Sequence, residues 1–325
     1  MESFIFAVNA VMPIVLMVAA GYVIKRLGII DEKIASGINK VVFRLLIPCM
    51  LFLSVYGIND IATIAPGYMI YAVLASTVVF FCTAFASRLV TSDGAQRGVL
   101  VQSSFRSNYA LVGIPLATSL FGAEGTMVAT VLSAVSIPIF NVLAVISLTA
   151  FTSSGKPDFK KIINGIFKNP LIISIFSGFA VLLIRFAFTK LGIGFRLTDI
   201  APLYSALEQL SKASTPVALL ALGAQFEFSV VGALKKQIIF GTLVRTVIVP
   251  AVALTIAYLM GCFSGAHFAA FVALFATPVA VSSVPMTQEM GGDTTLVGQL
   301  VVWTTLISGF TIFMFSFILK SVGIF

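Results

Sequence analysis

The stretch "FRSNYALVGIPL", residues 105–116, interrupts an apolar segment that is long enough to cross a membrane. It contains Arg106 and Asn108, which lipid disfavours, and Gly113 and Pro115, which weaken a helix. Inside a bilayer, non-helical backbone persists only where protein or a water-filled cavity satisfies its polar groups. The stretch therefore predicts a broken membrane helix beside a polar site.

The composition around this stretch is that of a membrane protein. Of the 325 residues, 59% are hydrophobic and 10% are charged, and the mean hydropathy is +1.10. The net charge of +8 does not indicate a nucleic-acid partner, because the basic residues gather at particular ends of apolar segments. The three cysteines and one histidine lack metal-ligand spacing. We expect a protein of the lipid bilayer without a metal ion or cofactor.

A window of about 20 residues finds ten apolar segments. They are Phe4–Ile24, Ile34–Tyr56, Gly67–Val90, Arg97–Phe121, Thr126–Phe151, Pro170–Lys190, Leu203–Gln225, Gln237–Met260, Ala266–Met290 and Thr294–Lys320. The predicted fold is an all-α polytopic membrane protein with ten transmembrane helices. Five helices lie in residues 1–151, five lie in residues 170–325, and residues 152–169 connect the two halves.

The distribution of lysine and arginine predicts the orientation of these helices. Basic residues are concentrated in the connections after spans 1, 3, 5 and 7, which alternate with connections that carry few. Because cytoplasmic connections are enriched in lysine and arginine, the 152–169 connection is expected in the cytoplasm. Both termini are then expected outside the cytoplasm, with the protein in the cell membrane, the inner membrane of a bacterium.

The two halves resemble each other at a constant offset. Writing residues 105–116 above "FATPVAVSSVPM", residues 275–286, aligns Phe105 with Phe275 and Pro115 with Pro285 at an offset of 170. Since each half has an odd number of spans, the second half enters the membrane from the opposite face. We therefore expect two inverted five-helix repeats, with broken helices 4 and 9 that cross near the middle of the membrane.

Broken helices that cross in the membrane predict an anion site. The N-terminal end of each half-helix carries partial positive charge, which favours a carboxylate. No aspartate or glutamate lies near either break, whereas several cationic, hydroxyl and amide groups do. The candidate substrate-binding residues are Arg106, Ser107, Asn108, Pro115, Thr277, Pro278, Ser282, Ser283 and Pro285.

The chain resembles the auxin efflux carrier family, which includes plant auxin carriers and bacterial organic-anion permeases. The resemblance covers nearly the whole chain, including "VMPIVLMVAAGYVIKRLGIID" and "INKVVFRLLIPCMLFLS", and is most specific at "NYALVGIPL". It implies a scaffold of helices 1, 2, 6 and 7, and a transport unit of helices 3–5 and 8–10 that moves as an elevator. It also implies a homodimer, a substrate carboxylate at Asn108, and a crossover marked by Pro115 and Pro285.

One departure from the plant carriers bears on the substrate. Only eighteen residues, Thr152–Asn169, connect the halves, where the plant carriers usually have a long hydrophilic insert. The chain is therefore similar to the bacterial branch, which implies malate, malonate or another small carboxylate rather than auxin.

Several alternatives remain open at this point. Asn108 can hydrogen-bond a neighbouring helix instead of a substrate, and Arg106 can satisfy carbonyls of the broken helix or reach the interface. A cation/proton antiporter can share the fold but needs carboxylates at the crossing, and a passive channel is a further alternative. An enzyme is not expected, because one histidine and no GxSx-type elbow cannot assemble a hydrolase site.

Overall fold

The computed structural model describes residues 2–58, 66–152 and 167–324, so most of the 152–169 connection lies outside the described residues. In those residues the regular elements are helices, and the strand-like pairing is one isolated bridge. Six helical stretches of the described chain are long and apolar enough to cross a membrane. They are Glu32–Tyr56, Pro66–Leu89, Tyr109–Thr152, Pro170–Lys190, Lys235–Met260 and Thr294–Ser321. The chain is therefore an all-α, multi-pass membrane protein, as predicted.

Six such stretches are fewer than the ten predicted spans, and four features account for the difference. The fourth predicted span is divided between the 12-residue helix Gly94–Phe105 and the start of the stretch Tyr109–Thr152, which continues through the fifth span. The first predicted span is a helix of 25 residues, but the side chains of residues 2–11 lie outside the description. The seventh is also a helix of 25 residues, which carries Glu208, Gln209 and Lys212. The ninth is interrupted, and its apolar helix Gly265–Phe275 has 11 residues, too few to cross a bilayer. The ten-helix arrangement stays a prediction.

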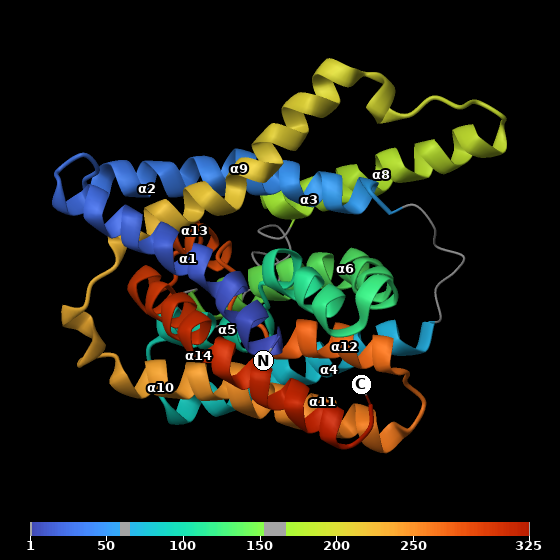
Figure 1. The fold of residues 1–325 in the computed structure, drawn as a ribbon. Helices are drawn as coiled ribbons and strands as arrows, with labels where there is room; N and C mark the ends of the chain where they lie inside the picture. Colours follow the sequence, from blue (N-terminus) through green and yellow to red (C-terminus); the bar gives the residue numbers. More distant parts are fainter. Residues whose placement is uncertain (1, 59–65, 153–166, 325) are drawn as a thin grey trace.

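A first group of helices forms the upper layer in Figure 1, and its member α1 runs obliquely from this layer down to the N-terminus. In this group α1 packs along α9, and α3 packs against both α8 and α9. Side-chain caps begin two of its helices, because Asp31 accepts a hydrogen bond from the Ile34 amide and Asn169 accepts one from the Leu171 amide. The members are α1 (Glu2–Arg26), α2 (Glu32–Val41), η1 (Val42–Leu46), α3 (Ile47–Tyr56), α8 (Pro170–Lys190) and α9 (Ala201–Gln225).

Two glycines allow the close contact between α1 and α9. A Cβ atom on Gly21 would lie 2.2 Å from the Leu220 carbonyl oxygen, and one on Gly223 would lie 2.0 Å from the Val18 carbonyl oxygen. Both distances are far shorter than a carbon atom tolerates, so neither position accepts a larger residue without separating the helices. Small residues at such contacts are typical of helix pairs in membranes, where close backbone packing supplies the attraction.

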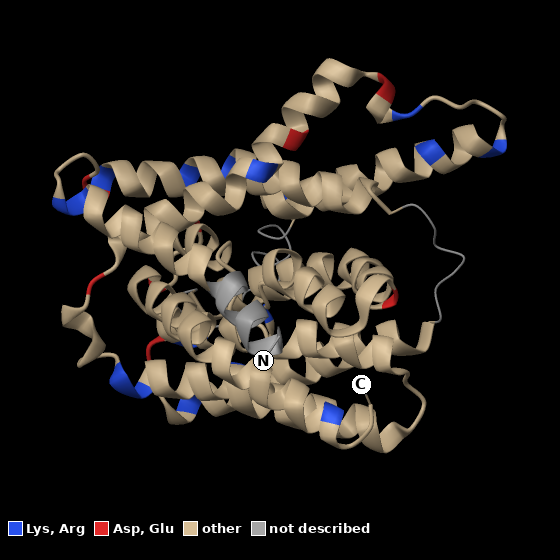
Figure 2. Cartoon of the chain, in the orientation of Figure 1, with Lys and Arg blue, Asp and Glu red and all other residues tan. Residues whose placement is uncertain are grey.

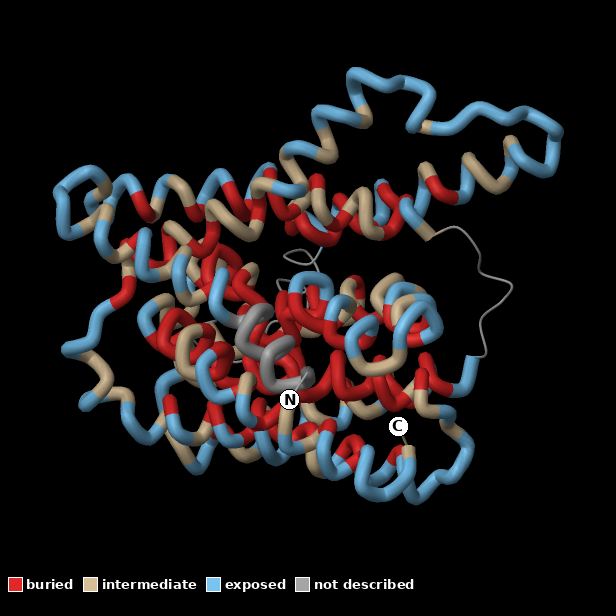
Figure 3. The backbone as a smooth tube through the Cα atoms, viewed as in Figure 1, coloured by how far each residue is buried: buried red, intermediate tan, exposed pale blue. Residues whose placement is uncertain are grey.

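A second group of helices forms the lower layer in Figure 1. Within it α6 packs against α5 and α12, and α10 packs against α14. Figure 3 shows buried backbone concentrated in the centre of this group. The members are α4 (Pro66–Ala86), α5 (Gly94–Phe105), η3 (Tyr109–Gly113), α6 (Ile114–Thr152), α10 (Lys235–Leu243), η6 (Val244–Ile248), α11 (Val249–Met260), α12 (Gly265–Phe275), α13 (Ser283–Glu289) and α14 (Thr294–Ser321).

The long α6 reverses direction near its start. Gly122 has φ 59° and ψ −145°, which no helix accommodates. The hydroxyl oxygens of Thr118 and Thr126 lie 2.7 Å apart, although eight residues of continuous helix would separate them by about 12 Å. The chain therefore folds back at Phe121–Gly122, between the predicted fourth and fifth spans, and α6 consists of two antiparallel helices.

Charged residues are scarce inside the second group. Figure 2 shows lysine and arginine mainly on the first group and at the helix ends of the second group. Two arginines are exceptions, because Arg106 and Arg245 are 2% and 0% exposed. Buried charges in a membrane protein are costly and commonly mark functional sites. The region around these two arginines is therefore a candidate functional site.

Candidate functional site

Two helices of the second group stop inside the fold and restart after a non-helical segment. Helix α5 ends at Phe105, and helical backbone resumes at Tyr109 in η3, which continues into α6. Helix α12 ends at Phe275, and α13 begins at Ser283. Pro278 lies in the second interruption and Pro285 lies just after it, whereas Gly113 and Pro115 follow the first interruption within the helical backbone of η3 and α6.

The two non-helical segments bond to each other. The Asn108 amide donates to the Pro278 carbonyl oxygen at 2.8 Å, and the Ala280 amide donates to the Arg106 carbonyl oxygen at 3.1 Å. These bonds form an antiparallel bridge between Ser107 and Val279. Backbone groups that the helices leave without partners are thus satisfied by the other segment, as the interior of a membrane protein requires. We call residues 106–108 and 278–280 the paired segments.

A cavity of about 60 Å³ lies beside the paired segments and between the two helix groups. One water molecule needs about 10–15 Å³ on this scale, so the cavity has room for a few waters or a small polar group. None of its lining residues is acidic. They are Ile47, Met50, Leu51, Ser214, Thr215 and Ala218 from the first group, and Arg106, Ser107, Asn108, Tyr109, Ala110, Leu111, Ile137, Phe140, Asn141, Ala280, Val281 and Ser282 from the second.

Donors without acceptors surround this cavity. The side-chain nitrogen of Asn108 and the hydroxyl of Ser107 have no hydrogen-bond partner among the described residues, and these residues are 8% and 4% exposed. The helical backbone that begins at Tyr109 adds amide groups whose acceptors lie outside the helix. A buried donor that lacks a partner costs about 1–3 kcal/mol, so the site favours a ligand that accepts hydrogen bonds.

Arg106 brings a positive charge to the cavity. Its Nη2 atom donates to Asn141 Oδ1 at 2.8 Å and to Ser282 Oγ at 3.1 Å, and its Nη1 atom lies 2.8 Å from Met286 Sδ. These partners are neutral, and the ion pairs of the described chain do not include Arg106. A buried charge without a counter-charge is unfavourable, and an anionic ligand in the cavity would compensate it.

The predicted site residues fall into two sets. Four of them, Arg106, Ser107, Asn108 and Ser282, line the cavity. The other five lie around the helix breaks without lining it. Pro115 is exposed in the first turn of α6. Thr277 follows α12, and its hydroxyl donates to the Ala273 carbonyl oxygen in the last turn of that helix. The Pro278 carbonyl joins the paired segments. Ser283 and Pro285 are buried in the first turn of α13.

Sequence reasoning missed Asn141. This residue accepts the hydrogen bond from Arg106 and donates its own amide to the Ile137 carbonyl oxygen at 2.8 Å. Its side chain thereby links α6 to the paired segments. The sequence did contain a signal for Asn141, because a polar amide follows Pro138 by three residues in an otherwise apolar span.

Sequence reasoning also missed Arg245, which lies in η6 and is fully buried. Its guanidinium donates to the carbonyl oxygens of Thr277 at 2.8 Å, Leu274 at 2.9 Å and Ser104 at 3.1 Å. An arginine in the middle of the predicted span Gln237–Met260 was the available signal, because an ionisable residue inside a membrane indicates a function by default.

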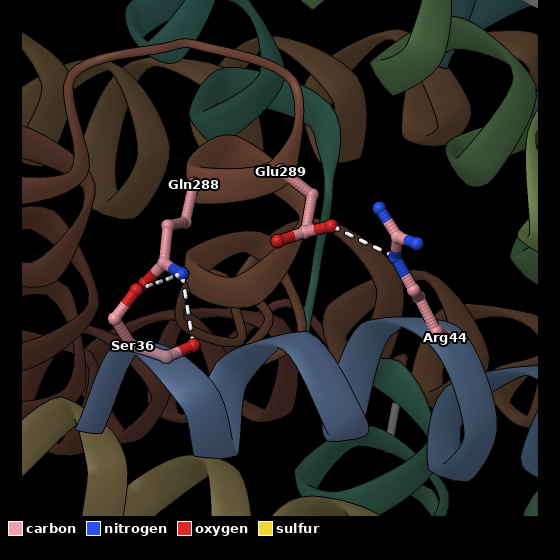
Figure 4. Close-up of polar contacts among 4 residues, drawn as sticks. All are labelled: Ser36, Arg44, Gln288 and Glu289. Carbon is pink, nitrogen blue, oxygen red and sulfur yellow. Dashed lines mark hydrogen bonds and ion pairs between the residues drawn. The ribbon is translucent and has the colours of Figure 1, made fainter. Parts of the chain in front are cut away.

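Polar contacts join the two helix groups near the end of α13 (Figure 4). The Gln288 side chain donates to the carbonyl oxygen of Ser36 at 3.0 Å and to its hydroxyl at 2.9 Å. The Nε atom of Arg44 donates to Glu289 at 3.0 Å and forms an ion pair with it. These contacts cross the same boundary as the cavity, so any sliding of one group along the other must break them.

Comparisons with known proteins agree with a membrane transporter. A family model described as "membrane transport protein" matches residues 6–157 and 158–316, nearly the whole chain. An uncharacterized transporter of Methanothermobacter thermautotrophicus is 27% identical over 317 residues, which are 94% of this chain and 96% of that protein. A second uncharacterized transporter, from Methanocaldococcus jannaschii, is 26% identical over 267 residues, which are 78% of this chain and 79% of that protein.

Proposed function

The chain belongs to the membrane transport protein family, the auxin efflux carrier family that its sequence resembles, and on this premise we propose that it transports small organic anions. The proposed substrate site is the cavity beside the paired segments. One observation carries the proposal: among the residues that the structure describes, a buried arginine without a counter-charge and an asparagine amide without a partner line a cavity that has no acidic residue. Such a site suits a carboxylate, which supplies both a negative charge and hydrogen-bond acceptors.

The lining of the cavity argues against the main rival. A cation/proton antiporter would need a carboxylate to hold Na⁺ or H⁺ in a low-dielectric site, and none of the lining residues supplies one. A passive channel could carry the same anions, and it would differ from a secondary transporter in that its flux is not coupled to an ion gradient. Flux of the carboxylate measured with and without a proton or sodium gradient separates a coupled transporter from a uniporter or channel.

We propose further that the two helix groups are the scaffold and the transport unit of an elevator. In this assignment the first group supplies helices 1, 2, 6 and 7, and the second supplies helices 3–5 and 8–10, with helices 4 and 9 broken at the paired segments. The ten helices would form two inverted repeats in residues 1–151 and 170–325. The location of the cavity between the groups supports this proposal, because sliding would carry a bound anion from one side to the other.

The proposed identity of the substrate and the proposed oligomeric state both rest on the resemblance to the auxin efflux carrier family. We propose malate, malonate or a similar small carboxylate as the cargo, with auxin-like acids as an alternative. The same resemblance implies a homodimer in the cell membrane. Sedimentation of the detergent-solubilised protein tests the dimer separately from transport.

Electrode recordings from proteoliposomes test the proposed site. Jumps of malate, malonate or indole-3-acetate should produce saturable currents, whereas Na⁺ and K⁺ jumps at fixed pH should not. In Asn108→Ala the half-saturating concentration should rise roughly 5- to 150-fold, because a hydrogen bond to a charged group contributes about 1–3 kcal/mol.

Gln209→Ala is a matched control, since it removes an exposed amide of α9 far from the cavity lining. Its currents should equal those of the native protein. Unchanged currents in Asn108→Ala would move the site elsewhere, and saturable currents from the cations alone would favour the antiporter or the channel.

Labelling of single cysteines tests the proposed orientation. Ser154 lies outside the described residues, in the connection proposed to be cytoplasmic. In a cysteine-free background, Ser154→Cys should resist membrane-impermeant maleimide in intact cells and react after permeabilisation. Gly194→Cys, in the exposed connection between α8 and α9, should react in intact cells. The opposite pattern would invert the topology.

A further inference from the structure

Arg245 lies behind the paired segments, outside the cavity lining. It is fully buried, and none of its hydrogen-bond acceptors is a carboxylate; the ion pairs in the described part of the chain do not include it. Burial of a guanidinium without a counter-charge costs desolvation free energy, so other interactions of Arg245 must offset this cost. The three carbonyl oxygens that it contacts supply the explanation.

These carbonyls belong to the ends of both broken helices. Ser104 lies in the last turn of α5, Leu274 lies in the last turn of α12, and Thr277 follows two residues after α12 ends. The last carbonyls of a helix lack intrahelical partners and together carry about half of an elementary negative charge. One planar guanidinium with five donors reaches all three carbonyls, which the compact ammonium of a lysine cannot match.

The consequence concerns the charge that the cavity presents. At the first break, the negative end of α5 and the positive end of the helix that begins at Tyr109 are separated by residues 106–108. Opposite partial charges so close together cancel much of each other's field. The guanidinium of Arg245 places a positive charge at the carbonyl ends of α5 and α12 and so offsets their negative partial charge. The positive partial charge of the helix that begins at Tyr109, which lines the cavity, then determines the field at the ligand.

We infer that Arg245 gives the site its preference for anions by neutralising the carbonyl ends of α5 and α12, without touching the ligand. This inference rests on the proposed function and adds a specificity-determining residue to it. Arg245 acts through the helix ends, so it is a positioning residue. A purely structural role predicts a different result, because a neutral donor at this position would then serve nearly as well.

A comparison of acids with their neutral amides separates the two roles. The probes are malonate, succinate and indole-3-acetate, each paired with its amide, and the readout is the ratio of acid affinity to amide affinity for purified protein. In Arg245→Gln this ratio should fall on the order of tenfold, the effect of one charge about 10 Å away at an effective dielectric constant of about 20. In Arg245→Lys the ratio should stay within about threefold of the native value, because the charge is kept.

Thr246→Val is the matched control for disturbance of η6. Thr246 is buried beside Arg245, and its hydroxyl donates to the Thr242 carbonyl oxygen within the helix. The control should leave the acid-to-amide ratio unchanged. Thermal unfolding of each variant without ligand shows whether it is folded.

The possible outcomes are distinguishable. Equal losses of acid and amide affinity in Arg245→Gln, or a native ratio in that variant, would overturn the inference. If Arg245→Gln does not fold, Arg245→Met takes its place as a neutral replacement of similar length: a tenfold fall of the ratio supports the inference, and a native ratio overturns it. A native protein that binds no acid better than its amide would instead refute the proposed function itself.

Discussion

Replacement of Arg106 by glutamine is expected to lower the affinity for carboxylates by a factor of roughly a hundred to several thousand. Glutamine can keep a hydrogen bond to Asn141 or Ser282, but it removes the buried charge that lines the cavity. Removal of one partner of a buried ion pair costs about 3–5 kcal/mol, and each 1.4 kcal/mol is a factor of about ten. Isothermal titration of the purified protein with malate, malonate and indole-3-acetate measures the change.

Arg88→Gln is the control for this substitution, since Arg88 is exposed in the short helix after α4 and lies away from the cavity. Its affinities should match those of the native protein. Arg106→Gln should not acquire transport of Na⁺ or K⁺, because the cavity still lacks a carboxylate. Native affinity in Arg106→Gln would assign Arg106 to a structural role and would weaken the proposed anion site.

A covalent link between Ser36 and Gln288 is expected to abolish transport. These residues contact each other across the boundary between the helix groups (Figure 4). In a cysteine-free background, Ser36→Cys and Gln288→Cys treated with a short, reducible thiol cross-linker would hold the groups together. If the second group must slide along the first, uptake of carboxylate into proteoliposomes should stop and should return after reduction.

A link within one group provides the control. Thr118 and Thr126 lie 2.7 Å apart in the two antiparallel parts of α6, so cysteines at these positions link residues that move together. Uptake should survive this cross-link. Full uptake with the 36–288 link in place would rule out sliding at this contact, and a block by the 118–126 link would show that the reagent acts elsewhere.

The sequence alone predicted the class of the protein, an all-α protein with several membrane-spanning segments. Hydropathy marks the membrane segments because burial in lipid depends on local composition. Helical backbone does stop within the stretch 105–116, but it stops at Phe105 and resumes at Tyr109, so Gly113 and Pro115, on which the predicted break rested, lie in helical backbone. Hydropathy also placed the boundary between the fourth and fifth spans within a few residues of the reversal at Gly122.

Tertiary structure alone decided what the buried arginines contact. Arg106 meets Asn141, 35 residues away, and Arg245 meets Ser104, 141 residues away. The contact between Ser36 and Gln288 spans 252 residues. No local preference encodes such pairs, because they depend on which helix faces meet when distant segments pack together. A sequence shows that an arginine lies in a membrane segment, but packing determines whether its side chain lines a cavity, as at Arg106, or contacts helix ends, as at Arg245.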